Sequence, residues 1–393
     1  MLNISFIIKK IILLFFFAPF AVIVKLLKKI FKFEAYYLTS YRIGNLAIGP
    51  EILCKTVRSK KKTYLIFEKP ISNIFLYNLY KKKLKDFNII CLKDNFFIKA
   101  TNKANFLFSK NEIIKRYKID RSKFYIFDNK KKFLNLKKKD INYGYESIKK
   151  INLQKKDKWI CIHNRDSKYL DSIDKSKNWR YHNYRDYSIN SMLPSIKYFI
   201  SKGYKVVRIG KNSNEKISYK HASVIDLPFN KIRTDFIEIF LVANCEFFIG
   251  TSSGAFKLAR IFRKPVFLIN VCPFESLFVE KWNYPAIFKR LFHTKLRNYV
   301  KISNIIKQKL AFINDTRVFR KKKLEFRSNT PSEILNFSKE ILEFLKNELS
   351  FYNNKLYGDK LYKFQNIIKK DYKISRMKFQ NHIGKAFLLS IKL

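Results

Sequence analysis

Four short apolar runs in the second half of the chain, each the length of a buried strand, stop abruptly at polar residues or glycines. The first ends at His163, Arg165 and Asp166; the next three end at Arg208, Gly210 and Lys211, at the segment from Gly250 to Gly254, and at Asn270. In open α/β sheets, ligands bind beyond the carboxyl ends of parallel strands. The pattern therefore predicts a parallel sheet with a ligand site along one edge.

The third junction has the composition of an anion site. Gly250 and Gly254 allow the backbone to approach a ligand, Ser252 and Ser253 supply hydroxyl donors, and an apolar helix is expected to begin directly afterwards. No Gly-Lys-Ser/Thr follows, which excludes a P-loop. Such a turn alone can equally serve close packing. Its place after the other strand ends favours ligand binding.

Several segments together resemble a known family. They are His163-x-Arg165-Asp166, His182-Asn-Tyr-Arg185, Val207-Arg208-Ile-Gly210, Phe248 to Gly254, and Lys264-Pro265 with Asn270. The series is similar to bacterial glycosyltransferases of surface-carbohydrate gene clusters, most densely over residues 158–275. More distantly, His163-x-Arg165 resembles the basic strand-end motif of GT-B fucosyltransferases, in which arginine holds the donor diphosphate. This chain has Asp166 where that motif usually has a second arginine.

The resemblance implies an α/β fold of the GT-B kind, with two Rossmann-like domains facing a cleft. It implies transfer of a sugar from a nucleotide-sugar donor to a cell-surface glycan or a lipid-linked acceptor, with no separate cofactor. We expect a hydrophobic helix in residues 1–33, an acceptor-side domain in 34–155, a donor domain in 156–350 and a basic tail in 351–393. Two alternatives stay open: a pyruvyl- or phosphoryl-type transferase acting on surface glycans, and a non-enzymatic basic protein that binds membrane or RNA.

Glycosyl transfer requires stabilisation of the leaving diphosphate and, in inverting enzymes, a base for the acceptor hydroxyl. The catalytic candidates are His163, Arg165 and Asp166; the candidates for donor binding are Arg208, Lys211, Asp226, Ser252, Ser253 and Gly254; those on the acceptor side are Arg42, Asn45, His182 and Arg185. The guanidinium fork of arginine suits a diphosphate. His163 is a base or a hydrogen bonder. Asp166 is a base or, as we favour, the partner that orients Arg165.

A structural alternative exists for Arg208, which also pairs readily with Asp226 or Glu215. The strand ends offer no carboxylate pair with metal-ligand spacing, so we expect no metal site. The five cysteines are scattered and form no Cys-x-x-Cys pair, which disfavours zinc and fits a reducing cytoplasm.

The chain carries a formal charge of +52, from 82 basic and 30 acidic residues. The lysines are spread along the chain together with abundant Ile, Asn, Phe and Tyr, as an AT-rich genome would produce. No nucleic-acid-binding module is recognisable, so we expect no nucleic-acid partner. The charge favours anionic membrane surfaces and phosphorylated substrates.

Residues 11–24 form an unbroken apolar run at the N-terminus. As a helix the run covers about 21 Å, less than the ~30 Å of a bilayer core. Lysines flank it on both sides, which favours a helix lying in an anionic leaflet over one crossing it. We expect a monotopic or re-entrant anchor on the cytoplasmic face of the inner membrane, with a single-pass helix and a signal or buried core helix as alternatives.

The first domain is expected to alternate strands and helices. The pattern predicts strands over 63–67, 88–92 and 105–108, with helices over 74–85 and 111–117. The Lys- and Asn-rich stretch 130–156 is the expected boundary between the two domains.

Overall fold

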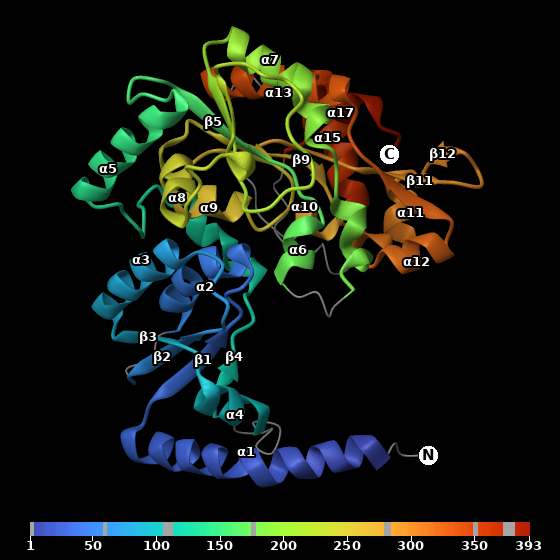
Figure 1. The fold of residues 1–393 in the computed structure, drawn as a ribbon. Coiled ribbons are helices and arrows are strands. Elements are labelled where there is room, and N and C mark those ends of the chain that lie inside the picture. Colours follow the sequence, from blue (N-terminus) through green and yellow to red (C-terminus); the bar gives the residue numbers. More distant parts are fainter. Residues whose placement is uncertain are drawn as a thin grey trace. The chain divides into compact units, whose positions relative to one another are not determined.

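The computed structural model describes residues 4–57, 61–104, 113–173, 178–278, 284–348, 353–371 and 382–393. The chain divides into two compact units, Met1–Asp120 (unit 1) and Arg121–Leu393 (unit 2) (Figure 1). The division lies upstream of the Lys-rich stretch that was expected to hold it. Each unit is built around its own parallel sheet.

Unit 1 contains four parallel strands in the order β3-β2-β1-β4. The strands are β1 (Glu34–Leu38), β2 (Thr63–Phe67), β3 (Ile89–Lys93) and β4 (Lys115–Arg116), and the helices are α1 (Ile4–Phe31), α2 (Ile43–Thr56), α3 (Ile74–Leu84) and α4 (Phe96–Ala104), with a short 3-10 turn η1 (Lys85–Phe87). The strands predicted at 63–67 and 88–92 and the helix predicted at 74–85 are confirmed, and the strand predicted at 105–108 lies outside the described residues. Asn73 begins α3 by accepting a hydrogen bond from the backbone N–H of Leu76, 2.8 Å away.

The helix predicted over 111–117 is wrong where the structure describes it. Residues 115–116 form β4, which pairs with β1 at Tyr36 and Tyr37; residues 111–112 lie outside the described ranges. Local sequence favours a helix here, but an edge position beside β1 supplies the backbone with partners from another strand. Tertiary pairing overrides propensity in so short a segment.

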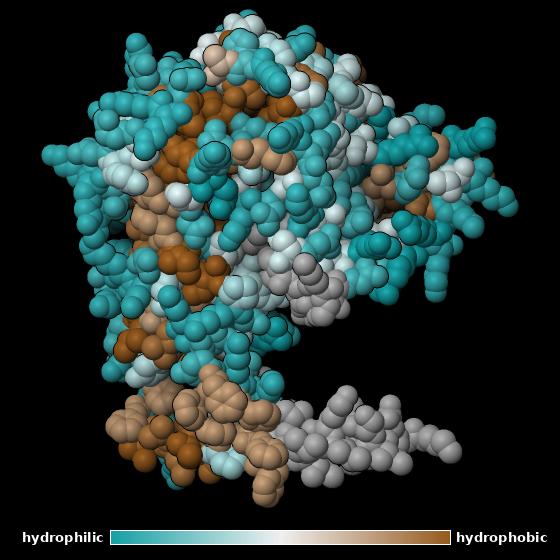
Figure 2. Space-filling view, in the orientation of Figure 1, coloured by the Kyte–Doolittle hydropathy of each residue, from teal (hydrophilic) through white to brown (hydrophobic). Residues whose placement is uncertain are grey.

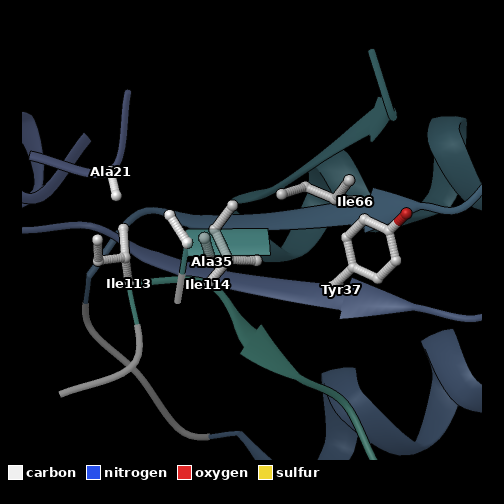
Figure 3. Packing of buried hydrophobic residues seen from close by; sticks show 7 residues of the cluster. Ala21, Ala35, Tyr37, Ile66, Ile113 and Ile114 are labelled. Atoms are coloured by element: carbon white, nitrogen blue, oxygen red, sulfur yellow. The ribbon is translucent and has the colours of Figure 1, made fainter. Parts of the chain in front are cut away.

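Helix α1 lies against unit 1 through its C-terminal half. Ala21 is fully buried in a cluster with Ala35, Ile113 and Ile114 (Figure 3). Phe17 packs against the same cluster. Among the helices in the described ranges, none combines the length and the apolarity that a membrane crossing requires.

Unit 2 contains six parallel strands in the order β10-β9-β8-β5-β6-β7. They are β5 (Trp159–His163), β6 (Lys205–Arg208), β7 (Val224–Asp226), β8 (Phe248–Gly250), β9 (Val266–Val271) and β10 (Ala286–Phe288). Numbered within the unit, this is the 3-2-1-4-5-6 order of a doubly wound Rossmann sheet. The chain reverses its direction of growth between β5 and β8, so the topological switch point lies there. The four strands predicted for this half are confirmed.

Helices and a small second sheet complete unit 2. The second sheet is antiparallel, in the order β12-β11-β13, with β11 (Arg290–His293), β12 (Asn298–Tyr299) and β13 (Leu324–Arg327). The helices are α5 (Lys138–Ile148), α6 (Lys168–Ile173), α7 (Leu193–Ser201), α8 (Asp235–Asn244), α9 (Phe256–Ile261), α10 (Glu275–Phe278), α11 (Ile302–Lys307), α12 (Thr316–Lys321), α13 (Pro331–Lys346), α15 (Lys355–Ile368) and α17 (Lys385–Ser390). Thr330 and Glu333 form a capping box at the start of α13.

The described residues after 350 belong to unit 2. Ile383 forms a parallel bridge with Ala286 at the outer edge of β10, and the Tyr357 hydroxyl donates to the Ile383 carbonyl at 2.8 Å. Phe364 of α15 is fully buried. The basic segment expected as a separate tail therefore helps to cover the edge of the sheet.

Helix α5 also belongs to unit 2, because it packs against α8. The rings of Tyr145 and Phe240 meet edge to face with centroids 5.2 Å apart. A Cβ atom added at Gly144 would lie 2.2–2.6 Å from ring atoms of Phe240, so only glycine allows this approach. Phe240 is fully buried and cannot move aside freely.

Replacing Gly144 tests this packing. We expect Gly144→Ala to lower the free energy of unfolding of unit 2 by about 1–3 kcal/mol, because overpacking outweighs the better helix propensity of alanine. The matched control is Gly358→Ala in α15, where the new Cβ meets nothing within 4 Å. The control is expected to be neutral or stabilising by up to about 1 kcal/mol. Urea denaturation of the two variants measures the difference, and equal stabilities would contradict the packing of α5 on α8.

Candidate functional site

The candidate site lies at the switch point of unit 2. His163 at the end of β5 pairs with Gly250 at the end of β8. A Cβ atom on residue 250 would lie 2.9 Å from the His163 carbonyl oxygen, so glycine is required where the two strand ends meet. The loops that leave these strands carry most of the residues singled out in the sequence. The parallel sheet thus brings them to one edge, as the strand ends predicted.

His163 is held as a neutral imidazole. Its Nδ1 lies 3.1 Å from the Ile209 carbonyl oxygen, which can only accept, so Nδ1 carries the proton and Nε2 keeps a lone pair. Burial lowers the pKa of His163 to about 4, and the nearby Arg208 adds to this effect. Gly210, with φ of +143°, lies beside the ring. At neutral pH His163 therefore offers a hydrogen-bond acceptor rather than a charge.

Arg165 is oriented by a residue that the sequence analysis did not identify. Arg165 is 9% exposed, and its Nη1 donates to the Asp186 carboxylate and, at 3.2 Å, to the His182 carbonyl oxygen. Within the described ranges, its Nε and Nη2 make no hydrogen bond to protein. The orienting partner is thus Asp186, and the expectation that Asp166 orients Arg165 is wrong.

Asp166 is occupied elsewhere. One carboxylate oxygen accepts from the Lys168 backbone N–H at 3.1 Å, and the other accepts from the Asn214 N–H at 3.1 Å and from the Ser213 hydroxyl. Both oxygens therefore fix the loop that follows β6. This placement makes Asp166 a positioning residue for that loop.

Three cationic side chains gather around Asp186: Arg165, Arg185 and Lys289. Lys289 is 2% exposed, and its ammonium group donates to the backbone carbonyls of Asp186, at 2.6 Å, and Tyr184, at 3.1 Å. Arg185 donates to the Ser252 carbonyl and so joins this cluster to the loop after β8. We call these four residues, Asp186 and the three cations, the cationic cluster.

The cationic cluster has an excess of positive charge in a poorly hydrated place. Burial raises the pKa of Asp186 to about 6, although Arg165, Lys289 and Arg185 all act in the opposite direction. Burial likewise lowers the pKa of Lys289. Asp166, whose oxygens are engaged by the neighbouring loop, also contributes to raising the pKa of Asp186. Desolvated groups of this kind bind a complementary anion strongly.

Arg208 has a structural role here. It is 1% exposed, and its donors reach the side chains of Asn164, Ser213 and Asp226 and the Glu215 carbonyl oxygen. A guanidinium has five N–H groups, and these partners engage all of them. The salt bridge to Asp226 considered in the sequence analysis is therefore present, and the direct contact with phosphate expected of Arg208 does not fit. Asp226 also accepts from the Ile217 N–H at 2.9 Å, which ties it to the same loop.

The remaining donor-side candidates differ in accessibility. Lys211 is exposed beyond β6. The Ser252 hydroxyl donates to the Cys272 carbonyl at 2.7 Å and so bonds to the end of β9. The Ser253 oxygen accepts from the Ala255 N–H at 3.3 Å, and in the described ranges its own proton has no acceptor. Gly254 follows in the turn that leads into α9.

The acceptor-side candidates separate into two places. His182 and Arg185 lie in a short 3-10 segment, η5 (Arg180–Arg185), where His182 binds Arg165 through its carbonyl and Arg185 belongs to the cationic cluster. Arg42 and Asn45 lie in unit 1, where α2 begins after the carboxyl end of β1. The structure therefore groups His182 and Arg185 with the donor-side residues.

Sequence reasoning missed Asp186 and Lys289. Asp186 directly follows Arg185, which the sequence analysis names, but it does not itself end a predicted strand. Lys289 follows a three-residue strand, β10, that is too short to show a periodicity, and it stands 105 positions after its partner Tyr184. A short apolar run that ends at a lysine was the available signal. In the described part of the chain, no group of three or more His, Cys, Asp or Glu side chains has the arrangement of a metal site.

Comparison with known proteins gives distant structural neighbours. No family model matches the chain, and a search of curated proteins finds no match. A family 9 glycosyl transferase from Veillonella parvula aligns with 11% identity over 60% of this chain and 79% of its own, with a TM-score of 0.34. ADP-heptose LPS heptosyltransferase II of E. coli aligns with 12% identity over 65% and 90%, with a TM-score of 0.35.

A third neighbour is TibC, described as an iron-containing dodecameric glycosyltransferase from enterotoxigenic E. coli. It aligns with 12% identity over 64% of this chain and 60% of its own, with a TM-score of 0.33. All three neighbours are glycosyltransferases. Because the TM-scores lie below 0.5, a functional assignment has to come from the side chains of the site itself.

The lowered pKa of His163 has a measurable consequence for stability. Between pH 6.5 and about 4 the unfolded chain binds a proton at this histidine while the folded chain does not, so unfolding becomes more favourable as the pH falls. As the pH falls from 6.5 to about 4, we expect the free energy of unfolding to decrease less for His163→Asn than for the wild type. Above pH 7, the free energy of unfolding should change with pH in nearly the same way in both proteins. Urea denaturation at a series of pH values measures both slopes. Parallel slopes between pH 6.5 and 4 would contradict a buried, neutral His163.

Proposed function

We propose that the chain is a glycosyltransferase of the GT-B class that moves a sugar from a nucleotide-sugar donor to a glycan or lipid-linked acceptor. The observation that carries the proposal is the cationic cluster at the switch point of a sheet with Rossmann strand order. Dinucleotides and related ligands bind at such switch points, outside the carboxyl ends of the strands. A diphosphate is the anion that matches both the charge and the place.

The chemistry of the proposed reaction is stabilisation of a leaving group. When the sugar–phosphate bond breaks, negative charge grows on the diphosphate, and cations preorganised in a poorly hydrated site stabilise that charge. Arg165 supplies the unoccupied N–H groups, with Asp186 holding its other edge. Lys289 fixes the backbone around Asp186 and contributes its charge. The Ser253 hydroxyl adds a neutral donor from the turn after β8.

His163 serves in this proposal as a binding residue. A pKa of about 4 makes it a poor general base at neutral pH, because the ideal catalytic pKa lies near the working pH. Its Nε2 lone pair instead accepts a hydrogen bond from a hydroxyl of the donor. Arg208 contributes indirectly, by holding the loop after β6 against which His163 is oriented.

Nucleotide affinity tests the role of Arg165. In calorimetric titrations with UDP, GDP and ADP, we expect the wild type to bind at least one of them and Arg165→Ala to bind it about ten- to a hundredfold more weakly, because a charge-assisted hydrogen bond to phosphate is lost. Ser253→Ala, which removes a neutral donor, should weaken binding less. Turnover of the matching nucleotide sugar should be unchanged by EDTA.

The matched control is Arg260→Ala. Arg260 pairs with Asp128 at 3.2 Å, and the two side chains are 8% and 19% exposed, close to the 10% and 24% of the Arg165–Asp186 pair. It therefore reproduces the loss of a buried ion pair away from the strand ends. Unchanged affinity in a folded Arg165→Ala protein, an equal loss in Arg260→Ala, or no nucleotide binding by the wild type would contradict the proposal.

Proton linkage provides a separate test. A bound diphosphate near Asp186 should raise the pKa of this carboxyl above about 6, so that binding takes up protons between pH 6 and 7. We expect binding enthalpies measured in buffers of different ionisation enthalpy to reveal this uptake. Asp186→Asn should reduce the proton uptake. The size of this reduction gives the number of protons taken up by Asp186, as distinct from any taken up by His163. Uptake that is equal in both proteins would place the nucleotide away from the cationic cluster.

A further inference from the structure

The face of α1 that points away from the rest of unit 1 is as apolar as the face that packs against it. Phe17, Ala21 and Val24 contact the core of unit 1, and the Lys28 ammonium donates to the Ile113 carbonyl at 3.3 Å. At 100° per residue these four positions share one stripe of the helix. A helix on the surface of a water-soluble domain normally carries polar side chains opposite such a stripe.

The opposite stripe of α1 is formed by exposed hydrophobic residues instead. Its members, with their exposed fractions, are Phe15 (79%), Phe16 (63%), Val22 (45%), Ile23 (54%), Leu26 (55%), Leu27 (40%) and Ile30 (69%). Exposed apolar residues scattered singly need no explanation, but a continuous stripe of large ones marks an interaction surface. Because the stripe runs along a docked helix, the surface extends parallel to the helix axis.

Helix α4 enlarges this surface on one side. Phe96 and Phe97 are 65% and 60% exposed, although they begin the helix that packs on α1. The Phe20 ring lies 6.1 Å from the Phe96 ring and 5.4 Å from the Phe97 ring, so the aromatic groups of both helices are continuous. Figure 2 shows hydrophobic residues gathered over α1 and α4.

The charged side chains of α1 and α4 are all lysines. Lys25 and Lys29 lie on the flank of α1 between the packed and the exposed stripes, on the side away from Phe20, and Lys32 follows directly after the end of the helix. Neither α1 nor α4 contains an acidic residue. An apolar strip bordered by lysines matches the interface of an anionic bilayer, where the strip enters the acyl region and the lysines reach the phosphates.

We propose that α1 and α4 together form a membrane-docking surface, which binds an anionic bilayer with the axis of α1 in the membrane plane. The packed stripe fixes this orientation, because a crossing α1 would have to give up the contacts of Ala21. The two phenylalanines of α4 belong to the bilayer contact as much as α1 does. This inference does not depend on the proposed glycosyl transfer.

Flotation of the full chain with lipid vesicles tests the surface. We expect binding to phosphatidylglycerol vesicles, weaker binding to phosphatidylcholine vesicles, and partial loss of binding at high salt. Phe96→Ser/Phe97→Ser should lower partitioning into phosphatidylglycerol vesicles by about tenfold or more. The control is Leu356→Ser/Tyr362→Ser in α15 of unit 2, where the side chains are 66% and 67% exposed, and it should bind as the wild type does.

Two further variants keep the test decisive if the double variant fails to fold. Phe97→Ser alone changes one exposed ring, and Leu26→Gln/Ile30→Gln changes only the outward stripe of α1. Both should weaken vesicle binding while the melting temperature stays near that of the wild type. Wild-type binding by all three folded variants would overturn the proposal. The proposal would also be overturned if the wild type did not bind vesicles but formed a dimer, detected by light scattering, and Phe97→Ser converted that dimer to monomers.

Discussion

The candidate site depends on the hydrogen bonds made by the buried guanidinium of Arg208. Arg208 lies at the end of β6 and donates to Asn164, just after β5, and to Asp226 at the end of β7. It also donates to the Ser213 hydroxyl and the Glu215 carbonyl oxygen, both in the loop between β6 and β7. Ser213 in turn holds Asp166, and the carbonyl of Ile209 in the same loop orients His163. A single charged group thus sets the geometry of three strand ends. Its burial is tolerable because every donor has a partner, whereas loss of one partner would leave a costly unsatisfied group.

The cationic cluster is the opposite case, since it combines three cations with a single carboxylate. Arg165 has protein partners along one edge of its guanidinium, and the described residues supply none along the other edge. Lys289 donates to carbonyl oxygens rather than to a carboxylate. Evolution of a stable core alone would favour neutral residues at such positions. A site that keeps excess positive charge at the switch point of a Rossmann-order sheet has the electrostatics required to bind an anion.

The strands of unit 2 and their common edge follow from the sequence because apolar runs ending in polar residues are a local signal. The pairing of Arg165 with Asp186 does not follow from the sequence, because it depends on how the chain folds around η5. The position of Lys289 does not follow either, because β10 is too short to be recognised as a strand. The same limit explains β4, where residues 115–116 take their partners from β1. Arg208 was recognised as a residue of interest, but its local sequence does not distinguish a ligand contact from a structural hub; only the number of its protein partners does.

The bridge between Ile383 and Ala286 gives the chain a particular order of completion during synthesis. Unit 1 finds its contacts within its first 120 residues, and it can form while the ribosome still holds the rest. Strand β10, in contrast, keeps an open backbone edge until His382 and Gly384 bond to Ala286 on its outer side. An open strand edge is a template for pairing with other chains. Residues 382–384 therefore cover the outer edge of β10, which would otherwise be open to pairing with another chain.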